Sequence, residues 1–142
     1  MVTVTSRPTS VSARLGGSGA GSIEAGAGAT AALAGLASDP GFTPLEFMDA
    51  ALAGCLVLSV RIAARKSGWG ERLQSVEVEI AHIKAEDGPS RVAEFTSAFK
   101  IVGDFTDEER EALIASAHEI CTVGNTFAAG AVVRDIAWSE AQ

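Results

Sequence analysis

The stretch TPLEFMDAALAGCLVLSV, residues 43–60, decides the fold. Thr43 is placed to cap the N-terminus of a helix, Pro44 suits its first position, and the carboxylate of Glu46 favours the positive end of the helix dipole. Basic residues crowd the far end before Ser67-Gly68 stops the pattern. We therefore predict a helix over residues 43–67, buried on nearly all sides and carrying Cys55.

Shorter elements surround this helix. Residues 1–42 are rich in Gly, Ala, Ser and Thr. Alternation predicts strands at 2–5 and 11–15, a third strand near 22–25, and a loop over 26–41. A hairpin is expected over 74–102, turning at 87–90. A second helix and a cysteine-bearing loop follow over 106–129, with Thr106 opening a capping box and one helical turn over 125–129. A last strand is expected over 131–138. This order predicts a single α+β domain over residues 1–142.

Composition limits the function classes. The 142 residues carry a net charge of −7, and Lys and Arg form no cluster, so no nucleic-acid partner is expected. The uncharged run 50–60 is shorter than the roughly 20 apolar residues of a membrane span, and no membrane partner is expected. Residues 1–23 contain no apolar segment of a secretory signal, although their Arg, Ser and Thr content has some transit-peptide character. We expect a cytoplasmic protein.

The only two cysteines, Cys55 and Cys121, lie 66 residues apart in different settings. Cys55 lies in an apolar helix, where a buried cysteine is commonly a small hydrophobe. Cys121 opens the segment CTVGNT, residues 121–126. A dithiol couple forms if the fold brings the two together. Together with the two cysteines, His82 and His118 would supply the four ligands of a zinc site. The local ligand spacing of a zinc site is missing, however, and no metal is expected.

The two cysteine segments carry a resemblance to a known family. Residues 43–55 resemble the Pro-x-Glu-Leu…Ala-Ala-Leu-x-Gly-Cys helix of the osmotically inducible and organic hydroperoxide resistance proteins, the OsmC/Ohr family. Residues 121–126 resemble its second motif, Cys-Pro-Val-Ser-Asn. The resemblance implies an OsmC-like fold, with antiparallel sheets and a long central cysteine-bearing helix in an intertwined homodimer.

The resemblance also implies an activity. The family reduces organic hydroperoxides with thiols, as stress-response antioxidant enzymes. Cys55 would be the peroxidatic thiolate, oxidised to a sulfenic acid, and Cys121 would resolve it to a disulfide. An external thiol or dihydrolipoyl reductant would restore both, without a bound cofactor.

The chain departs from the family motifs at two places. The family places an arginine from the N-terminal strands beside the thiolate, fixed by a glutamate; Arg14 and Glu46 are the candidates here. Glu46 lies nine residues before Cys55, on the opposite side of an ideal helix. Thr122 replaces the usual proline. Two alternatives therefore stay open beside the peroxidase: an OsmC-like fold that binds a small apolar ligand at the dimer interface, and a zinc-binding module.

Overall fold

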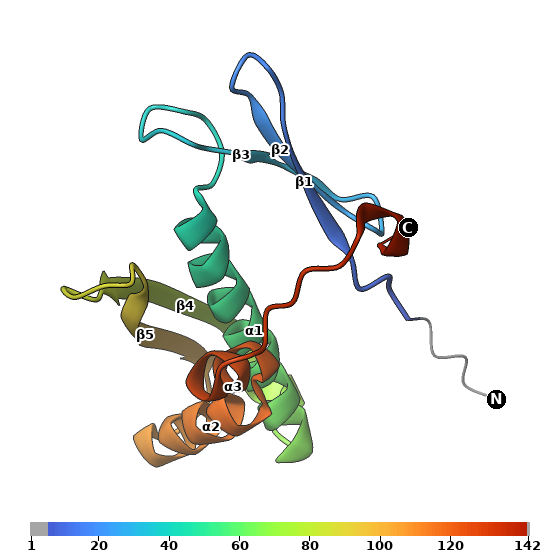
Figure 1. Cartoon of the computed structure of the whole chain (residues 1–142). Coiled ribbons are helices and arrows are strands. Elements are labelled where there is room, and N and C mark those ends of the chain that lie inside the picture. The colour runs from blue at the N-terminus through green and yellow to red at the C-terminus, as the bar shows by residue number, and fades with distance from the viewer. Residues whose placement is uncertain (1–5, 142) are drawn as a thin grey trace. The chain divides into compact units, whose positions relative to one another are not determined.

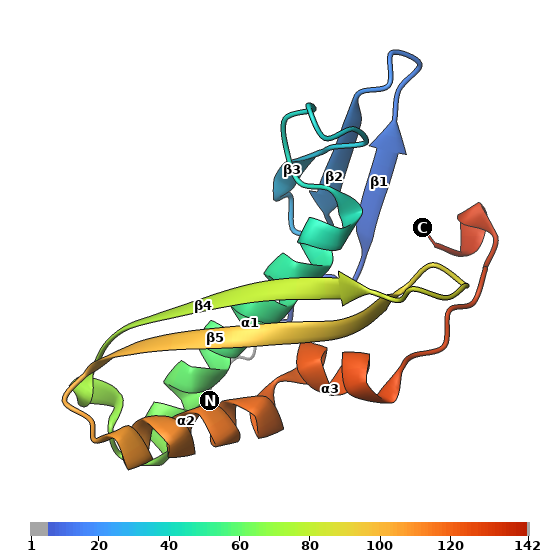
Figure 2. The same ribbon diagram turned by 90° about the vertical axis from the view of Figure 1, so that its left-hand side faces the viewer.

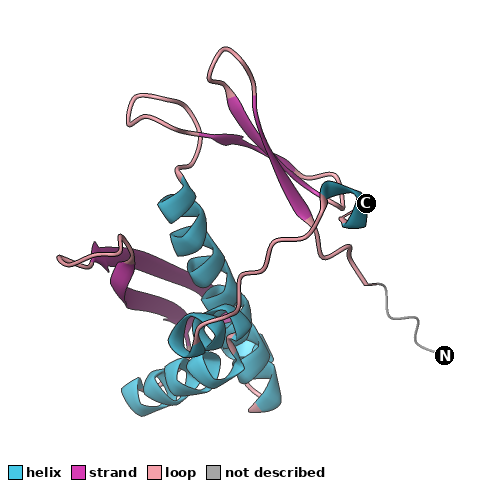
Figure 3. Ribbon diagram, in the orientation of Figure 1, coloured by secondary structure: helices cyan, strands magenta, loops and turns pink. Residues whose placement is uncertain are grey.

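A computed structural model describes residues 6–141 of the chain (Figure 1). Among these residues, 6–48 and 49–141 belong to two compact units, with helix α1 beginning in the first and continuing in the second. The strands predicted at 2–5 lie outside the described residues. The structure has the predicted α+β character, with antiparallel strands and helices (Figure 3). The prediction of one domain over 1–142 stays a prediction.

The N-terminal unit is a three-stranded antiparallel sheet in the order β1-β2-β3. Strand β1, Val11–Leu15, pairs with β2, Gly21–Ala25, and β2 pairs with β3, Thr30–Leu33. The third of these strands corrects the expectation of a loop over 26–41. Its residues are small and do not alternate in polarity, so pattern alone misses it. The strand forms because β2 offers a row of backbone partners.

Helix α1, Pro44–Lys66, follows the prediction closely. Thr43 and Glu46 make reciprocal bonds at its start: the Thr43 amide donates to Glu46 Oε1 at 3.1 Å, and the Glu46 amide donates to Thr43 Oγ1 at 3.3 Å. This helix is long and apolar enough, by length and composition, to cross a membrane. Its inward face is nevertheless buried in the core of the C-terminal unit, as expected of a core helix. That face consists of Leu52, Leu56, Ser59, Val60, Ala63 and Ala64.

The predicted hairpin is formed by β4, Leu73–Lys84, and β5, Val92–Gly103. The two strands are antiparallel, with Val78 opposite Phe99 and His82 opposite Phe95. Apolar side chains of one face pack towards the helices, while glutamates of β4 alternate with them towards solvent. Figure 2 shows the long twisted hairpin with α1 crossing behind it and α2 and α3 running alongside.

Two helices follow the hairpin. Helix α2, Asp107–Ile120, begins with the predicted capping box of Thr106 and Glu109. Helix α3, Thr122–Ala129, begins three residues earlier than the expected turn at 125–129. The helix is already capped at Cys121 and passes through Gly124.

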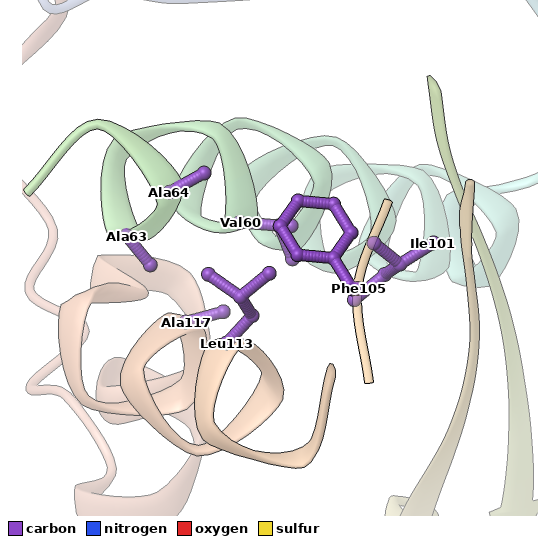
Figure 4. Close-up of a cluster of buried hydrophobic side chains, with 7 residues drawn as sticks. All are labelled: Val60, Ala63, Ala64, Ile101, Phe105, Leu113 and Ala117. Carbon is purple, nitrogen blue, oxygen red and sulfur yellow. The ribbon is translucent and has the colours of Figure 1, made fainter. Parts of the chain in front are cut away.

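The main core joins α1, β5 and α2. Figure 4 shows its side chains meeting between these elements. Leu113 of α2 points into the space between the two helices and is 1% exposed. This packing fixes the second half of α1, and with it the position of Cys55, against the segment that leads to Cys121. The buried residues are Val60, Ala63, Ala64, Ile101, Phe105, Leu113 and Ala117.

The last strand predicted over 131–138 is wrong. The residues after α3 form a loop that ends in the short 3-10 helix η2, Trp138–Glu140. Val132 and Val133 are each 94% exposed. A strand needs a neighbouring strand to satisfy its backbone groups, and none of the described strands pairs with this segment.

Candidate functional site

The structure brings Cys55 and Cys121 together, as the dithiol hypothesis required. Cys55 lies in the middle of α1 and is half-buried, whereas Cys121 joins α2 to α3 and is 0% exposed. Both belong to a small second core, in which Cys121 packs with Leu52 and Leu56 and Cys55 packs against all three. Both are free thiols. The site is therefore built within the C-terminal unit, from one helix and the junction between two others.

The two sulfurs meet the start of α3. Cys121 is the N-cap residue, and its Sγ accepts a hydrogen bond from the Gly124 amide at 3.3 Å. Cys55 and Val123 both pack against the small core that contains Cys121. Amides in the first turn of a helix have no intrahelical acceptor and favour negative charge in front of them.

The surroundings of Cys55 favour its thiolate. Burial opposes ionisation, but hydrogen bonds from the Val123 amide, the Cys121 thiol, the Ser59 hydroxyl and the Thr122 amide outweigh it and lower the pKa of Cys55 below that of an ordinary cysteine. All of these donors are uncharged groups. Because the thiolate is the reactive form of cysteine, the lowered pKa favours reactivity at Cys55.

Cys121 has the opposite character. Burial raises its pKa, and although the Gly124 amide counteracts this, interaction with the Cys55 sulfur raises the pKa further. Cys121 is thus the thiol of the pair that is harder to ionise. The two thiols therefore differ in acidity, with Cys55 more easily ionised and Cys121 less easily ionised than an ordinary cysteine.

A cavity of about 410 Å³ borders this cluster through Leu52, Leu56 and Gly124. Its wall includes Phe95 and Phe127, whose rings stack with centroids 4.9 Å apart. The mixture of aromatic, aliphatic and a few polar groups suits a small, largely apolar molecule. The lining residues are Leu52, Leu56, Val92, Ala93, Glu94, Phe95, Ser97, His118, Gly124, Asn125, Phe127 and Ala128.

Comparison with known proteins places the chain in a family. The sequence profile of the OsmC-like proteins matches residues 36–134, which include both cysteine segments and the hairpin. The chain belongs to the OsmC family. None of the curated proteins matches the sequence.

Solved OsmC-like structures share the fold. An OsmC-like protein from Mycoplasma pneumoniae superposes with a TM-score of 0.76 at 14% identity, over 87% of this chain and 89% of that one. An organic hydroperoxide resistance protein from Elizabethkingia anophelis superposes with a TM-score of 0.67 at 19% identity, over 89% of this chain and 90% of that one. The organic hydroperoxide resistance protein OhrB of Bacillus subtilis superposes with a TM-score of 0.64 at 22% identity, over 82% of this chain and 87% of that one. At these identities the likeness establishes the fold alone.

The other two predicted site residues of this OsmC-family chain belong to the N-terminal unit. Arg14 lies in β1, opposite Ser22 of β2, and its side chain is exposed. Glu46 is held in the capping box of α1, where the Thr43 amide and hydroxyl lower the pKa of its carboxyl. Capping is thus an observed role of Glu46. The assignment of Arg14 and Glu46 to the thiolate site stays a prediction.

One polar pair near the hairpin was missed by sequence reasoning. Asp49 of α1 lies on the helix face of Leu52 and Leu56, and its Oδ2 meets His82 Nδ1 of β4 at 2.7 Å. Its other oxygen, Oδ1, is buried without a hydrogen-bond partner within residues 6–141. The sequence did carry a signal for this pair: Asp49 precedes Leu52 by three and Leu56 by seven residues, which puts a carboxylate on the apolar face of the helix. This pair ties the first half of α1 to the hairpin.

Metal-ligating residues do not gather in the described part of the chain. No three His, Cys, Asp or Glu side chains of residues 6–141 lie as ligands of one ion would. His82 pairs with Asp49, and His118 stands edge-on to Phe99 with centroids 5.5 Å apart. Neither histidine is grouped with the cysteines as a ligand set within residues 6–141.

Proposed function

We propose that this OsmC-family protein is a thiol-dependent peroxidase that reduces organic hydroperoxides through a Cys55/Cys121 sulfenate-disulfide cycle. The observation that carries the proposal is the contact between two thiols of opposite character, Cys55 with a lowered and Cys121 with a raised pKa. The family relationship supports a peroxide-related role. No bound cofactor is part of the proposal, and the expected location is the cytoplasm.

The chemistry proceeds in three balanced steps. The Cys55 thiolate attacks the terminal oxygen of the hydroperoxide, the O–O bond breaks, and the leaving alkoxide takes a proton to become an alcohol. Cys55 is then a sulfenic acid. The Cys121 sulfur attacks the Cys55 sulfur, forming the disulfide while hydroxide leaves and, with the Cys121 proton, becomes water. Two thiol groups of an external thiol or dihydrolipoyl reductant then reduce the disulfide by exchange.

A homodimer is the proposed working form. On α1, Leu58 and Ile62 are 58% and 42% exposed and share with Cys55 a stripe spaced by three, four and seven residues. The loop after α3 adds exposed apolar side chains, including Val132 and Val133. A second copy of the chain, crossing at α1, would cover these exposed apolar side chains. Sedimentation tests this: wild type should be a dimer, and Leu58→Glu should be a monomer. Monomeric wild type would contradict the proposal.

Arg14 and Glu46 are included in the proposed site as the arginine that orients the hydroperoxide beside the thiolate and the carboxylate that fixes it. The family resemblance supports this assignment, as does the placement of Arg14 on a strand. Glu46 would serve this role in addition to capping α1.

Peroxide consumption by cysteine variants tests the proposal. Wild-type protein with an organic hydroperoxide and a dithiol reductant should consume the peroxide catalytically, whereas Cys55→Ser should consume none above background. Ala53→Ser, a substitution of similar size two residues away on α1, is the matched control and should retain turnover. Unchanged peroxide consumption by Cys55→Ser would disprove the proposal.

The cavity of about 410 Å³ favours a second candidate function, the binding of a small apolar ligand without peroxide chemistry. Saturable binding of such a ligand by a variant lacking both cysteines, together with peroxide-inert wild-type thiols, would support this candidate. Rapid peroxide turnover by wild type would exclude it as the sole function.

A further inference from the structure

We propose that a cavity between the second half of α1 and the start of β4 binds a small amphipathic organic anion, whose acidic group pairs with Arg61 and Arg65. This arginine cavity has a volume of about 870 Å³. It is lined by α1, by the 3-10 helix η1, Gly70–Arg72, and by the first residues of β4. Its lining residues differ from those of the cavity beside the cysteines. The inference therefore goes beyond the proposed peroxidase and does not rest on it.

The charge of the arginine cavity is opposite to that of the whole chain. Three arginines line it, although the net charge of the protein is −7. Arg61 and Arg65 lie four residues apart on α1, so their exposed side chains project from one face of the helix. Within residues 6–141 neither of them forms an ion pair. Glu71 supplies the one carboxylate among the described lining residues, so positive charge is in excess there.

The third arginine, Arg72, is held in place by the protein. Its Nε and Nη2 donate to the Asp104 carbonyl at 2.8 and 2.6 Å, and Nη2 also donates to Glu109 Oε2 at 2.5 Å. Its guanidinium lies over the rings of Trp69 and Phe105, with Cζ 5.1 and 4.9 Å from their centroids. Because Glu109 compensates the charge of Arg72, the uncompensated charge of the cavity is that of the two α1 arginines.

The turn after α1 positions the Arg65 side chain at the cavity. The chain reverses at Gly68, whose φ is +76° and whose amide donates to the Arg65 carbonyl at 3.0 Å. Helix η1 then passes close to α1: a Cβ on Gly70 would lie 3.3 Å from Arg65 Cγ. Glycine at this position leaves room for the aliphatic part of Arg65 against η1. The guanidinium of Arg65 is thus presented by local packing as well as by the helix.

The remaining wall of the arginine cavity determines the class of ligand. Val57 and Leu58 of α1 face Leu73 and Val76 of β4 across it, so an apolar surface adjoins the two arginines. The volume falls within the roughly 300–1,000 Å³ of small-molecule sites. Arginine pairs strongly with a carboxylate, and the apolar side chains favour a hydrocarbon. A medium-chain carboxylate combines both features and complements the charge.

Isothermal titration calorimetry tests the inference, with octanoate as the probe and 1-octanol as its uncharged counterpart. Wild-type protein should bind octanoate saturably and more tightly than octanol. Arg61→Gln and Arg65→Gln should each weaken octanoate binding about tenfold, because each removes a charge-assisted hydrogen bond. The control is Arg91→Gln, which removes the same charge near the opposite end of the hairpin, where Arg91 pairs with Asp87. It should bind octanoate as wild type does.

Two results would overturn the inference. One is octanoate binding of equal strength in wild type, Arg61→Gln and Arg65→Gln. The other is the absence of octanoate binding by wild type. Leu58 belongs both to this cavity and to the proposed dimer surface, so sedimentation of the same variants accompanies the titration. Monomeric Arg61→Gln together with dimeric wild type that binds no octanoate would mean that an acidic segment of a second copy fills the cavity instead.

A second measurement locates the ligand on wild-type protein. In NMR spectra, octanoate should shift the amide resonances of Gly68 and Gly70, which line the arginine cavity, and leave that of Gly124 unchanged. Shifts at Gly124 alone would place the ligand beside the cysteines and overturn the inference. Cys55→Ser should bind octanoate as wild type does, because it leaves the arginines intact. Failure of the peroxidase and failure of this site are therefore observed separately.

Discussion

Substituting Cys121 by serine and by alanine separates its two roles, which are to resolve the Cys55 sulfenic acid and to donate a hydrogen bond to the Cys55 thiolate. Serine keeps a donor for Cys55 and an acceptor for the Gly124 amide, the two interactions that the Cys121 sulfur makes. Alanine keeps neither. Serine is also a good N-cap residue, so α3 should remain intact in Cys121→Ser.

The magnitudes follow from these contacts. Alanine removes a hydrogen bond to a charged sulfur, a loss of about 1.5 kcal/mol, so the first oxidation step should slow about tenfold at pH 7. It also removes the cap of α3, a further cost of about 1 kcal/mol in unfolding free energy. In Cys121→Ser, the first step should stay within about threefold of wild type, since the donor is retained. Neither variant can form the intramolecular disulfide.

Stopped-flow mixing with an organic hydroperoxide and intact-mass analysis provide the assay. Cys121→Ser should release one alcohol per chain and gain about 16 Da as a Cys55 sulfenic acid, and then stop. Cys121→Ala should reach the same product more slowly. Equal slowing of the two variants would refute the hydrogen-bond role of Cys121. Wild-type protein that stops at the Cys55 sulfenic acid without forming a disulfide would refute its resolving role.

Four further predictions follow from the same geometry. Because the pKa of Cys55 is lowered, the rate of peroxide oxidation of the reduced protein should rise with pH and level off below the pH at which an ordinary thiol ionises. A rate that rises only at the pKa of an ordinary thiol would contradict this prediction. The Cys55 thiolate should also stabilise the fold, and this contribution should be fully present above the pKa of an ordinary thiol. It should be lost as the pH falls through the lowered pKa of Cys55 in the folded protein. Urea unfolding of Cys121→Ser at a series of pH values measures this change in unfolding free energy. Leu113→Ala should lower the unfolding free energy by about 3 kcal/mol, because the Leu113 side chain is 1% exposed. The control Ala115→Ser, on the exposed face of α2, should change the unfolding free energy by less than about 0.5 kcal/mol. Similar losses in the two variants would contradict the assignment of Leu113 to the core. Arg14→Ala and Glu46→Gln should each slow peroxide oxidation. Glutamine preserves the capping box, so an unchanged oxidation rate in Glu46→Gln would mean that Glu46 only caps the helix.

The central helix and the fold class could be predicted because their signals are local. Thr43, Pro44 and Glu46 mark the start of α1, an apolar run fills it, and basic residues end it. Alternation in residues 76–82 likewise predicted β4. The pairing of Cys55 with Cys121 came from the family resemblance, since no local pattern states that residues 66 positions apart meet.

The errors share a different cause, which is dependence on distant partners. Strand β3 has weak side-chain alternation and is defined by its hydrogen bonds to β2. The segment 131–138 has strand-like composition but pairs with none of the described strands. The hydrogen bond from the Gly124 amide to Cys121 Sγ carries no side-chain signature, so only the structure shows it. Backbone donors at a helix start are set by tertiary packing.

The most direct test of the peroxidase account is a count of thiols after one equivalent of organic hydroperoxide is added to fully reduced wild-type protein. The account predicts rapid loss of both thiols and about 2 Da from the intact chain, as Cys55 and Cys121 form a disulfide within one chain. Two thiols surviving at unchanged mass would contradict it.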